Sequence, residues 1–410
     1  MTARSAPPKG VTVIEGGSAT TPRGFVAGAV YAGIKTAGKG KLDLGILASD
    51  RPASAAAMFT RNNVKGAAVV VSQGHVRNGS ARGVVVNAGI SNVANGAPGM
   101  RDAKEMCRLA AAALGVNDAE LLVGSTGVIG HPLPMDRIRA GVPKIRLSAG
   151  GGPAFARAIM TTDTHPKTMA VRFRAAGREY RLGAVAKGVG MIHPDMATMF
   201  CFLTTDAAVE QRYLRGALKS AVDDSLNMIS VDGDTSTSDT TAIFANGAAG
   251  GPEIGATHAG AAAFERALCY VCTAMAKMLA RDGEGAEKLI EVRIEGAASE
   301  RQARAAARTV TASPLVKTAV HGADPNWGRL MMAVGRSGAR IDLARARAWL
   351  GDIMVYRGRP LPFDERAASD LLRNEEVLLR VDLGAGDASA TAWGCDLTPE
   401  YVHINSDYTT

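Results

Sequence analysis

The sequence predicts an α/β protein in which a layered arrangement of sheet and helices is followed by a smaller α/β domain. Two observations favour this class. Short apolar runs bounded by glycine-rich turns, at residues 83–90, 121–123 and 199–203, are typical of buried strands. Longer stretches with apolar residues at helical spacing, at 102–114 and 261–281, separate or follow them.

The first half of the chain alternates strands with helices. A strand over 83–90 runs into a Gly/Asn loop, and an alanine-rich amphipathic helix follows at 102–114. A short strand at 121–123 leads into a Gly/Ser/Thr turn, and residues 154–160 have a helical pattern. Two further strands are expected on either side of the turn at Gly177, and the second of these enters a glycine-rich loop.

The second half begins with the same kind of pattern and then changes. A buried strand over 199–203 is followed by a helix over 211–228, a polar loop at 232–239 and the long helix at 261–281.

From residue 289 onward we expect a smaller α/β domain. Its strands are predicted at 290–294, 377–383 and 388–393, with an Arg/Ala-rich helix after the first. The tail at 401–408 alternates apolar and polar residues, which favours a final strand that brings the C-terminus to a site; the alternative is a frayed end.

Composition and charge narrow the function classes. Of the 410 residues, 47% are hydrophobic and 21% charged, as in ordinary globular proteins. No apolar run approaches the roughly 18 residues that span a membrane, and no signal peptide is visible, so we expect a cytoplasmic protein. The net charge of +8 is scattered, with few aromatic residues, so no nucleic-acid partner is expected. We interpret Arg301, Arg304 and Arg308 as a solvated helix face.

Cysteine and histidine usage gives no sign of a disulfide framework or a metal site. The five cysteines are sparse and odd in number. Cys269 and Cys272 have CxxC spacing, but they lie within a helical pattern without a second pair, which favours two buried helix cysteines. The histidines are dispersed and form no zinc-binding motif.

Thr198 is the first candidate for chemistry. It stands behind a glycine-rich loop, after the small residue Ala197, and at the entry to the predicted strand over 199–203. A self-cleaving enzyme places its nucleophile in this way. If the Ala197–Thr198 bond breaks, the new α-amine of Thr198, with a pKa of roughly 7.7–8, can act as base for its own hydroxyl. The structural alternative is that Thr198 simply begins a strand.

Four further residues have a chemical and a structural interpretation. Thr126 and Gly127 lie in a turn after a strand, where a hydroxyl and an amide can stabilise an oxyanion, or where a plain β-turn forms. Lys187 ends a strand upstream of Thr198. It either holds a carboxylate or lowers a nearby pKa, or it is an exposed loop lysine. Glu284 lies between two glycines and either caps a turn or binds a substrate ammonium.

Together, these segments resemble the glutamate N-acetyltransferase/ornithine acetyltransferase family of arginine biosynthesis, the ArgJ-type proteins. The matching blocks occur in the same order across nearly the whole chain. They are residues 124–130, 160–164, 187–192, 196–199, 283–286, 322–329 and 404–410. Two positions depart from the family pattern: Ser238 replaces the usual Asn, and His321 stands where an apolar or aromatic residue is more common.

The resemblance implies a DmpA/ArgJ-like layered fold with an N-terminal threonine nucleophile. The precursor would cut itself between Ala197 and Thr198 by an N→O acyl shift. It would give an α chain (1–197) and a β chain consisting of 198–288 and a smaller domain (289–410), and the family pattern implies that these assemble as an α2β2 heterotetramer.

The resemblance also implies a ping-pong reaction. Thr198 would take the acetyl group of N-acetylornithine, release ornithine and pass the acetyl group to glutamate. Thr126 and Gly127 would form the oxyanion hole. The implied substrate-binding positions are Thr161, Lys187, Thr198, Glu284, Asn405 and Thr410. No metal or other cofactor is implied, although some members of the family also use acetyl-CoA as a donor.

Two other function classes stay open at this point. A self-processed amidohydrolase or aminopeptidase on the same fold would pass the acyl group to water rather than to glutamate. A non-enzymatic binding protein would retain the fold alone, and the presence of Thr198, Thr126, Gly127 and Lys187 argues against it.

Overall fold

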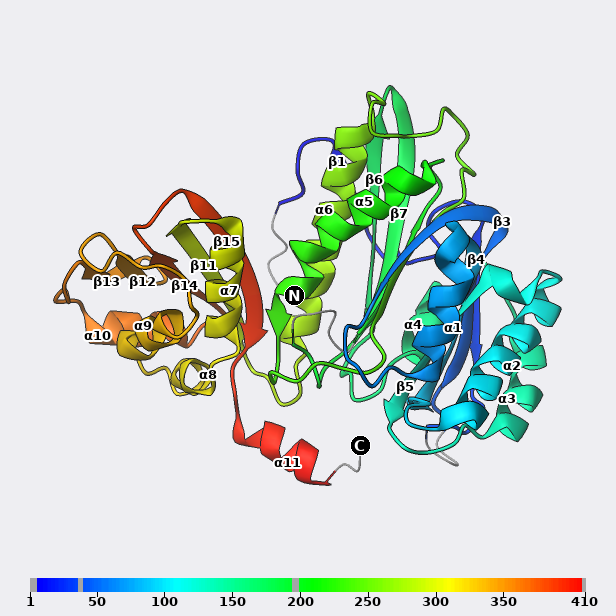
Figure 1. Ribbon diagram of the computed structural model, residues 1–410, viewed down its shortest axis with the longest axis horizontal. Helices are drawn as coiled ribbons and strands as arrows, with labels where there is room; N and C mark the ends of the chain where they lie inside the picture. Colours follow the sequence, from blue (N-terminus) through cyan, green and yellow to red (C-terminus); the bar gives the residue numbers. More distant parts are fainter. Residues whose placement is uncertain (1–5, 36–39, 194–198, 408–410) are drawn as a thin grey trace.

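The computed structural model describes residues 6–35, 40–193 and 199–407 and forms two sheets with a long helix between them (Figure 1). In the described residues, the larger sheet has nine strands, in the order β1-β6-β7-β8-β10-β3-β4-β5, with β2 paired to β3. Its strands are β1 Val11–Ile14, β2 Phe25–Val30, β3 Leu44–Phe59, β4 Ser80–Ile90, β5 Leu121–Val128, β6 Lys167–Ala175, β7 Arg178–Lys187, β8 Phe200–Thr205 and β10 Thr240–Ala245.

The smaller sheet has six strands in the described residues, in the order β13-β12-β14-β11-β15-β9. Its strands are β9 Ile229–Ser230, β11 Leu289–Ala297, β12 Arg347–Leu350, β13 Ile353–Arg357, β14 Glu376–Asp382 and β15 Ala388–Cys395. The α/β class expected from the sequence is therefore confirmed, as are the strands expected within 290–294, 377–383 and 388–393.

Helices cover both sheets. They are α1 Ala67–His75, α2 Gly96–Leu114, α3 Met135–Gly141, α4 Gly152–Ala158, α5 Gln211–Asp223, α6 Ala261–Arg281, α7 Glu300–Thr311, α8 Pro314–His321, α9 Trp327–Gly335, α10 Glu365–Leu372 and α11 Pro399–Asp407. The helix expected over 211–228 ends at Asp223, and a 3-10 turn follows at Leu226–Met228. No helix in the described ranges is long and apolar enough to cross a bilayer.

Strand β8 shows why the apolar run at 199–203 forms the centre of the larger sheet. Met199, Cys201 and Leu203 face the core cluster that also contains the inner side of α6. Phe200 and Phe202 face the opposite cluster, which α4 covers through Phe155. A strand buried on both faces needs apolar residues at every position, which explains the continuous run.

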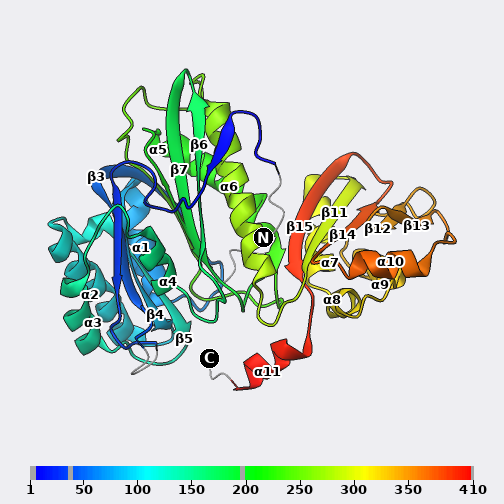
Figure 2. The same cartoon turned by 180° about the vertical axis from the view of Figure 1, so that it is seen from behind.

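Helix α6 joins the two sheets into one core. Val271 on α6 belongs to a single buried cluster that contains Val171 from the larger sheet and Val292 from the smaller one. Seen from both sides, α6 stands between the sheets (Figures 1 and 2). The end of this helix therefore lies where both sheets can contribute residues.

The C-terminal tail differs from the expectation. A final strand is expected at 401–408, but residues Pro399–Asp407 form helix α11, which follows β15 and runs below the lower end of α6 toward the larger sheet (Figure 2). Pro399 is favourable in the first turn of a helix. None of the α11 residues is buried. The alternation of apolar and polar residues at 401–408 therefore does not correspond to a buried face of a strand.

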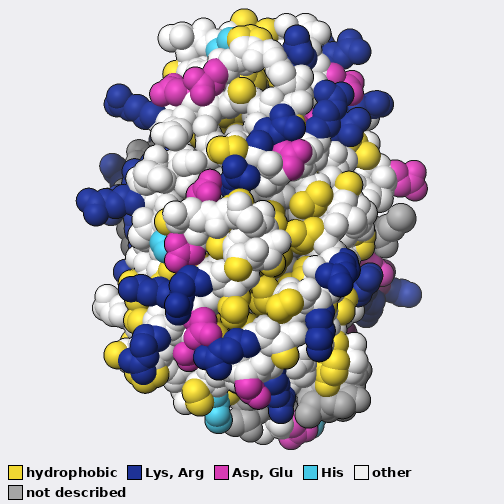
Figure 3. All heavy atoms as spheres, turned by 90° about the vertical axis from the view of Figure 1, so that its right-hand side faces the viewer, with side chains coloured by type: hydrophobic (Ala, Val, Ile, Leu, Met, Phe, Trp, Pro, Cys, Tyr) yellow, Lys and Arg dark blue, Asp and Glu magenta, His cyan; other side chains and the backbone are white. Residues whose placement is uncertain are grey.

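Positive side chains are spread over the face of the molecule that Figure 3 shows. In the face drawn in Figure 3, Lys and Arg side chains lie scattered among acidic and apolar residues rather than in one patch. This matches the dispersed charges of the sequence.

Candidate active site

A cavity of about 460 Å³ lies at the end of the larger sheet where β5 and β7 terminate. Loops from both halves of the chain and helix α11 form its wall. The described residues that line it are Asn62, Ser91, Thr126, Gly127, Ile129, Thr161, Thr162, Lys187, Gly190, Met191, Asp232, Asp234, Thr235, Ser236, Thr237, Ser238, Glu284, Tyr401 and Asn405.

Six of the predicted site residues come together in this cavity. They are Thr126, Gly127, Thr161, Lys187, Glu284 and Asn405. The remaining predicted positions, Ala197, Thr198 and Thr410, lie outside the described residues. The structure therefore brings together residues up to 279 positions apart in the sequence, from Thr126 to Asn405 (405 − 126).

Thr126 and Gly127 are expected in a turn, but both lie within strand β5, which continues to Val128, and the position of Gly127 admits only glycine. Gly127 is the second-last residue of β5, lies beside Gly89 of the parallel strand β4 and has a φ of +125°. A Cβ atom at this position would lie 2.3 Å from the carbonyl carbon of Gly89. The missing side chain lets the β5 backbone lie close to β4 immediately after the buried residue Thr126, at the edge of the cavity that both residues line.

Lys187 is buried at the last position of β7. Its Nζ donates a hydrogen bond of 3.1 Å to Oγ1 of Thr126. Burial lowers the pKa of Lys187, and Lys167 lowers it further, while Asp163, Asp239 and Glu284 act in the opposite direction. Lys187 is thus a hydrogen-bond donor whose positive charge is favoured by the nearby carboxylates.

Glu284 presents a fixed carboxylate to the same cavity. Oε1 accepts a hydrogen bond of 2.8 Å from the Thr162 hydroxyl, and Oε2 accepts one of 2.9 Å from Nδ2 of Asn405. Its backbone amide donates to the carbonyl of Val189 at 2.9 Å. The site therefore carries a positive and a negative side chain, each held by neighbours.

Gly190 makes room for this carboxylate. A Cβ at Gly190 would lie 2.5 Å from Oε2 of Glu284. Because Thr162 and Asn405 already hold the two oxygens, the carboxylate could not move aside without losing a hydrogen bond.

The start of β8 is anchored by Asp239. Its Oδ1 accepts a hydrogen bond of 2.8 Å from the amide of Met199, the first described residue after the gap at 194–198. Asp239 is completely buried. Burial raises its pKa well above the usual value, although the Met199 amide, Lys187 and Ser236 all favour the charged form.

Asp232 organises the loop that follows β7. Its carboxylate accepts hydrogen bonds from the amides of Met191 at 2.5 Å, Ile192 at 2.9 Å and Asp234 at 3.2 Å. Met191 has a φ of +55°, a conformation that side chains rarely adopt. Burial raises the pKa of Asp232 to about 6 against the effect of these amides.

Most residues of the cavity wall at 232–238 were not predicted from the sequence to belong to the site. This segment was recognised only as a polar loop, yet Asp232 and all residues from 234 to 238 line the cavity. Its density of Asp, Ser and Thr residues between two elements was the available signal. Asp163, Lys167 and Asp282, which lie behind the wall, were also missed as a group.

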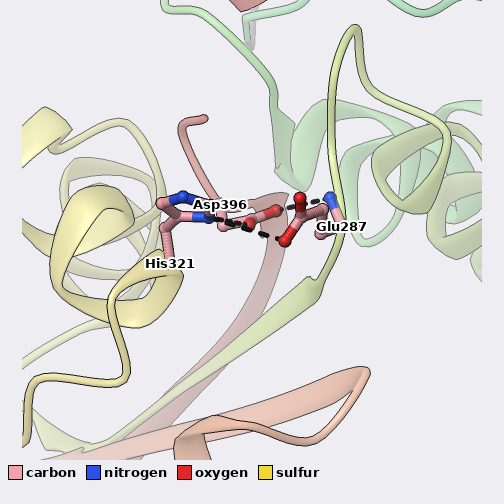
Figure 4. A group of neighbouring side chains, drawn as sticks. All are labelled: Glu287, His321 and Asp396. Atoms are coloured by element: carbon pink, nitrogen blue, oxygen red, sulfur yellow. Dashed lines mark hydrogen bonds and ion pairs between the residues drawn. The ribbon is translucent and has the colours of Figure 1, made fainter. Parts of the chain in front are cut away.

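One group of side chains in the described part of the chain has donor atoms close enough for a metal ion: Glu287, His321 and Asp396 (Figure 4). Nδ1 of His321 lies 3.1 Å from Oδ2 of Asp396 and 3.7 Å from Oε2 of Glu287. Oδ1 of the buried Asp396 accepts the amides of Glu287 and Lys288 at 2.9 and 2.8 Å. These contacts join the end of α8 to the end of β15, and none of the three residues lines the cavity.

The chain is similar to proteins of one known family. The model of the ArgJ family matches residues 26–410. The arginine biosynthesis bifunctional protein ArgJ of Symbiobacterium thermophilum is 53% identical over 397 residues, covering 96% of this chain and 99% of that protein. The protein of the same name from Dehalococcoides mccartyi is 49% identical over 401 residues, covering 98% and 99%. The crystal structure of the Bacillus halodurans protein of that name is 41% identical, with a TM-score of 0.49, and covers 51% of this chain and 98% of its own.

The raised pKa of Asp232 predicts a pH-dependent stability. Between its usual pKa of 3.8 and about 6, the folded chain holds a proton that the unfolded chain has lost. The contribution of Asp232 is therefore complete below pH 3.8 and decreases as the pH rises to about 6, by about 1–3 kcal/mol. Urea unfolding measures the free energy of unfolding at each pH. From pH 4 to pH 6.5, this free energy should fall by about 1–3 kcal/mol more in the wild type than in Asp232→Asn.

Asp387→Asn provides the control, since Asp387 is exposed in the turn between β14 and β15. It should retain the wild-type dependence on pH. Coinciding pH profiles for wild type and Asp232→Asn would contradict the prediction.

Proposed function

This chain belongs to the ArgJ family, and we propose that it is an acetyltransferase that moves the acetyl group of N2-acetyl-L-ornithine to L-glutamate, giving L-ornithine and N-acetyl-L-glutamate. One observation carries the proposal: Thr126 and Gly127, the buried Lys187 and the fixed Glu284 line one cavity beside the start of β8. That combination suits amino-acid substrates that share an α-carboxylate and differ in the charge of the side chain.

Thr198 is the proposed nucleophile, made available by cleavage of the Ala197–Thr198 bond. Its hydroxyl attacks the carbonyl of Ala197, the acyl group shifts from nitrogen to oxygen, and water hydrolyses the resulting ester. The freed α-amine then acts as base for the same hydroxyl. The pairing of β8 with β7 supports continued association of the two products, because Phe200 and Lys187 are opposite one another across the proposed cut.

Acetyl transfer then follows in two balanced steps. The Thr198 oxygen forms a bond to the acetyl carbonyl carbon, and collapse of the tetrahedral intermediate breaks the amide bond and releases ornithine with the transferred proton. The amine of glutamate next attacks the acetyl-Thr198 ester and regenerates the hydroxyl. We assign Thr126 and Gly127, which line the cavity, to the stabilisation of the oxyanion in both intermediates.

Charge complementarity assigns roles to the remaining residues. We assign Lys187 to the α-carboxylate that both substrates carry, and Glu284 to the side-chain ammonium of N-acetylornithine. Thr161 and Asn405 are cavity residues, and Asn405 also holds the Glu284 carboxylate. Thr410 completes the proposed substrate-binding set.

The proposal includes a second donor and an assembly. The relatives are named bifunctional proteins, so we extend the scheme to acetyl-CoA as a donor for the same acetyl-Thr198 and glutamate acceptor. It needs no metal or further cofactor. We propose chains of 1–197 and 198–410, the latter divided into 198–288 and 289–410, in a cytoplasmic α2β2 heterotetramer.

Dependence on glutamate separates the transferase from a hydrolase. With N-acetylornithine alone, release of ornithine should stop after about one equivalent per active site, because acetyl-Thr198 awaits an acceptor amine. Added glutamate should restore continuous turnover and yield N-acetylglutamate. Equally fast consumption of N-acetylornithine without glutamate would instead indicate an amidohydrolase.

Self-cleavage can be read from a denaturing gel. The purified wild-type protein should give two bands of similar size, corresponding to 1–197 and 198–410, whereas Thr198→Ala should give one uncut band, since it lacks the attacking hydroxyl. N-terminal sequencing of the larger product, 198–410, should begin at the threonine. A fully active wild-type enzyme that runs as one full-length band would refute the processing step.

The role of Glu284 can be tested with Glu284→Gln, which retains the shape of the side chain and removes its charge. Loss of a charge-assisted hydrogen bond worth about 1.5–3 kcal/mol should raise the KM for N-acetylornithine roughly 10- to 150-fold. The KM for glutamate should not rise. Steady-state kinetics with each substrate measure both values.

Glu287→Gln is the matched control for this experiment. Glu287 is exposed, three residues away, and outside the cavity lining. Its kinetics should be those of the wild type. If Glu284→Gln also behaves as the wild type, the residue has no part in recognising the ornithine side chain.

A further inference from the structure

Behind the wall of the cavity, Lys167 is completely buried at the first position of β6. Its Nζ lies 2.6 Å from Oδ1 of Asp163 and 2.5 Å from Oδ2 of Asp282. The side chains of both aspartates are also buried. An ammonium group in such a place is stable only when carboxylates replace the lost water.

The two carboxylates also bind backbone groups of the segments that form the cavity. Oδ1 of Asp163 accepts the amide of Gly188 at 2.9 Å, and Oδ2 accepts the amide of Thr161 at 2.9 Å. Gly188 directly follows Lys187, and Thr161 lines the cavity. One carboxylate therefore sets the positions of two backbone segments that carry site residues.

Asp282 connects a third segment to the same ammonium. It accepts the amide of Thr164 at 3.2 Å and also the Thr164 hydroxyl. It precedes Glu284 by two residues, at the end of α6. Lys167 thus lies where the segments bearing Thr161, Lys187 and Glu284 meet, although neither it nor the two aspartates line the cavity.

We propose that Lys167 is a positioning residue of the acetyl-transfer site: through Asp163 and Asp282 it fixes the separation and orientation of the Lys187 ammonium and the Glu284 carboxylate. This inference rests on the proposed function. A bare structural cross-link would stabilise the fold without altering substrate recognition, whereas a positioning residue controls the two groups that bind opposite charges.

The charges around Lys187 give the proposal an electrostatic consequence. Among the described residues, Asp163, Asp239 and Glu284 favour its charged form, and Lys167 opposes it. Lys35 is a further cation within range of Lys187. Removing the positive charge of Lys167 should raise the pKa of Lys187, and removing the negative charge of Asp163 should lower it.

The experiment compares Lys167→Met and Asp163→Asn with the wild type in the N-acetylornithine half-reaction. In both variants kcat/KM should fall roughly 10- to 100-fold, since misplaced binding groups reduce productive alignment. The alkaline limb of kcat/KM should move to higher pH in Lys167→Met and to lower pH in Asp163→Asn, because the Lys187 ammonium is the group that titrates there. A general loss of packing would not move the two limbs in opposite directions.

Lys277→Met is the matched control, since it removes a partly buried 2.8 Å ion pair with Glu291 between α6 and β11, away from the cavity. It should lower the melting temperature and leave KM and the pH profile unchanged.

The inference is overturned if Lys167→Met and Asp163→Asn behave like this control, with a lower melting temperature but with the wild-type KM and pH profile. If Lys167→Met does not fold, Asp163→Asn alone decides, through its kcat/KM and the shift of its alkaline limb to lower pH. A wild type without acetyl transfer would refute the proposed function, whereas an active wild type with kinetically normal variants would refute this inference alone.

Discussion

Everything at the site depends on the register of three neighbouring strands. Antiparallel pairing places Lys187 of β7 opposite Phe200 of β8, and parallel pairing places Thr240 of β10 opposite the same phenylalanine. A slip of one residue would turn each side chain to the other face of the sheet. Because β8 is packed between apolar clusters on both faces, the core itself holds the register that brings Lys187, Met199 and Asp239 to one end of the sheet.

The elements with strong periodic patterns were predictable from sequence. The long helix at Ala261–Arg281 and the central strand were recognisable because burial demands apolar residues at helical spacing in one and at every position in the other. The tail was misassigned for the opposite reason. Helix α11 buries no residue, so no packing requirement left its mark on the sequence, and its position depends on contacts such as that of Asn405 with Glu284.

The candidate site was only partly predictable. Thr126, Gly127 and Glu284 stand out in short glycine-rich motifs, where little else explains the residue types. Lys167 carries no such signal, because one of its two partners, Asp282, lies 115 positions away and its burial is a property of the folded chain. The loop at 232–238 likewise becomes a cavity wall only when β9 has joined the smaller sheet and β10 the larger.

The strand order of the larger sheet has a consequence for how the chain could be divided. β8 and β10 lie between β7 and β3, so two strands from beyond residue 198 are inserted among strands from before it. If residues 1–197 were made alone, β7 and β3 would each expose an unpaired edge where β8 and β10 are missing. If residues 198–410 were made alone, the β8–β10 pair would expose an unpaired edge on each side. Such edges favour aggregation, and complementation by two independently expressed halves would have to compete with it. The topology thus favours translation as one chain, with any division following folding.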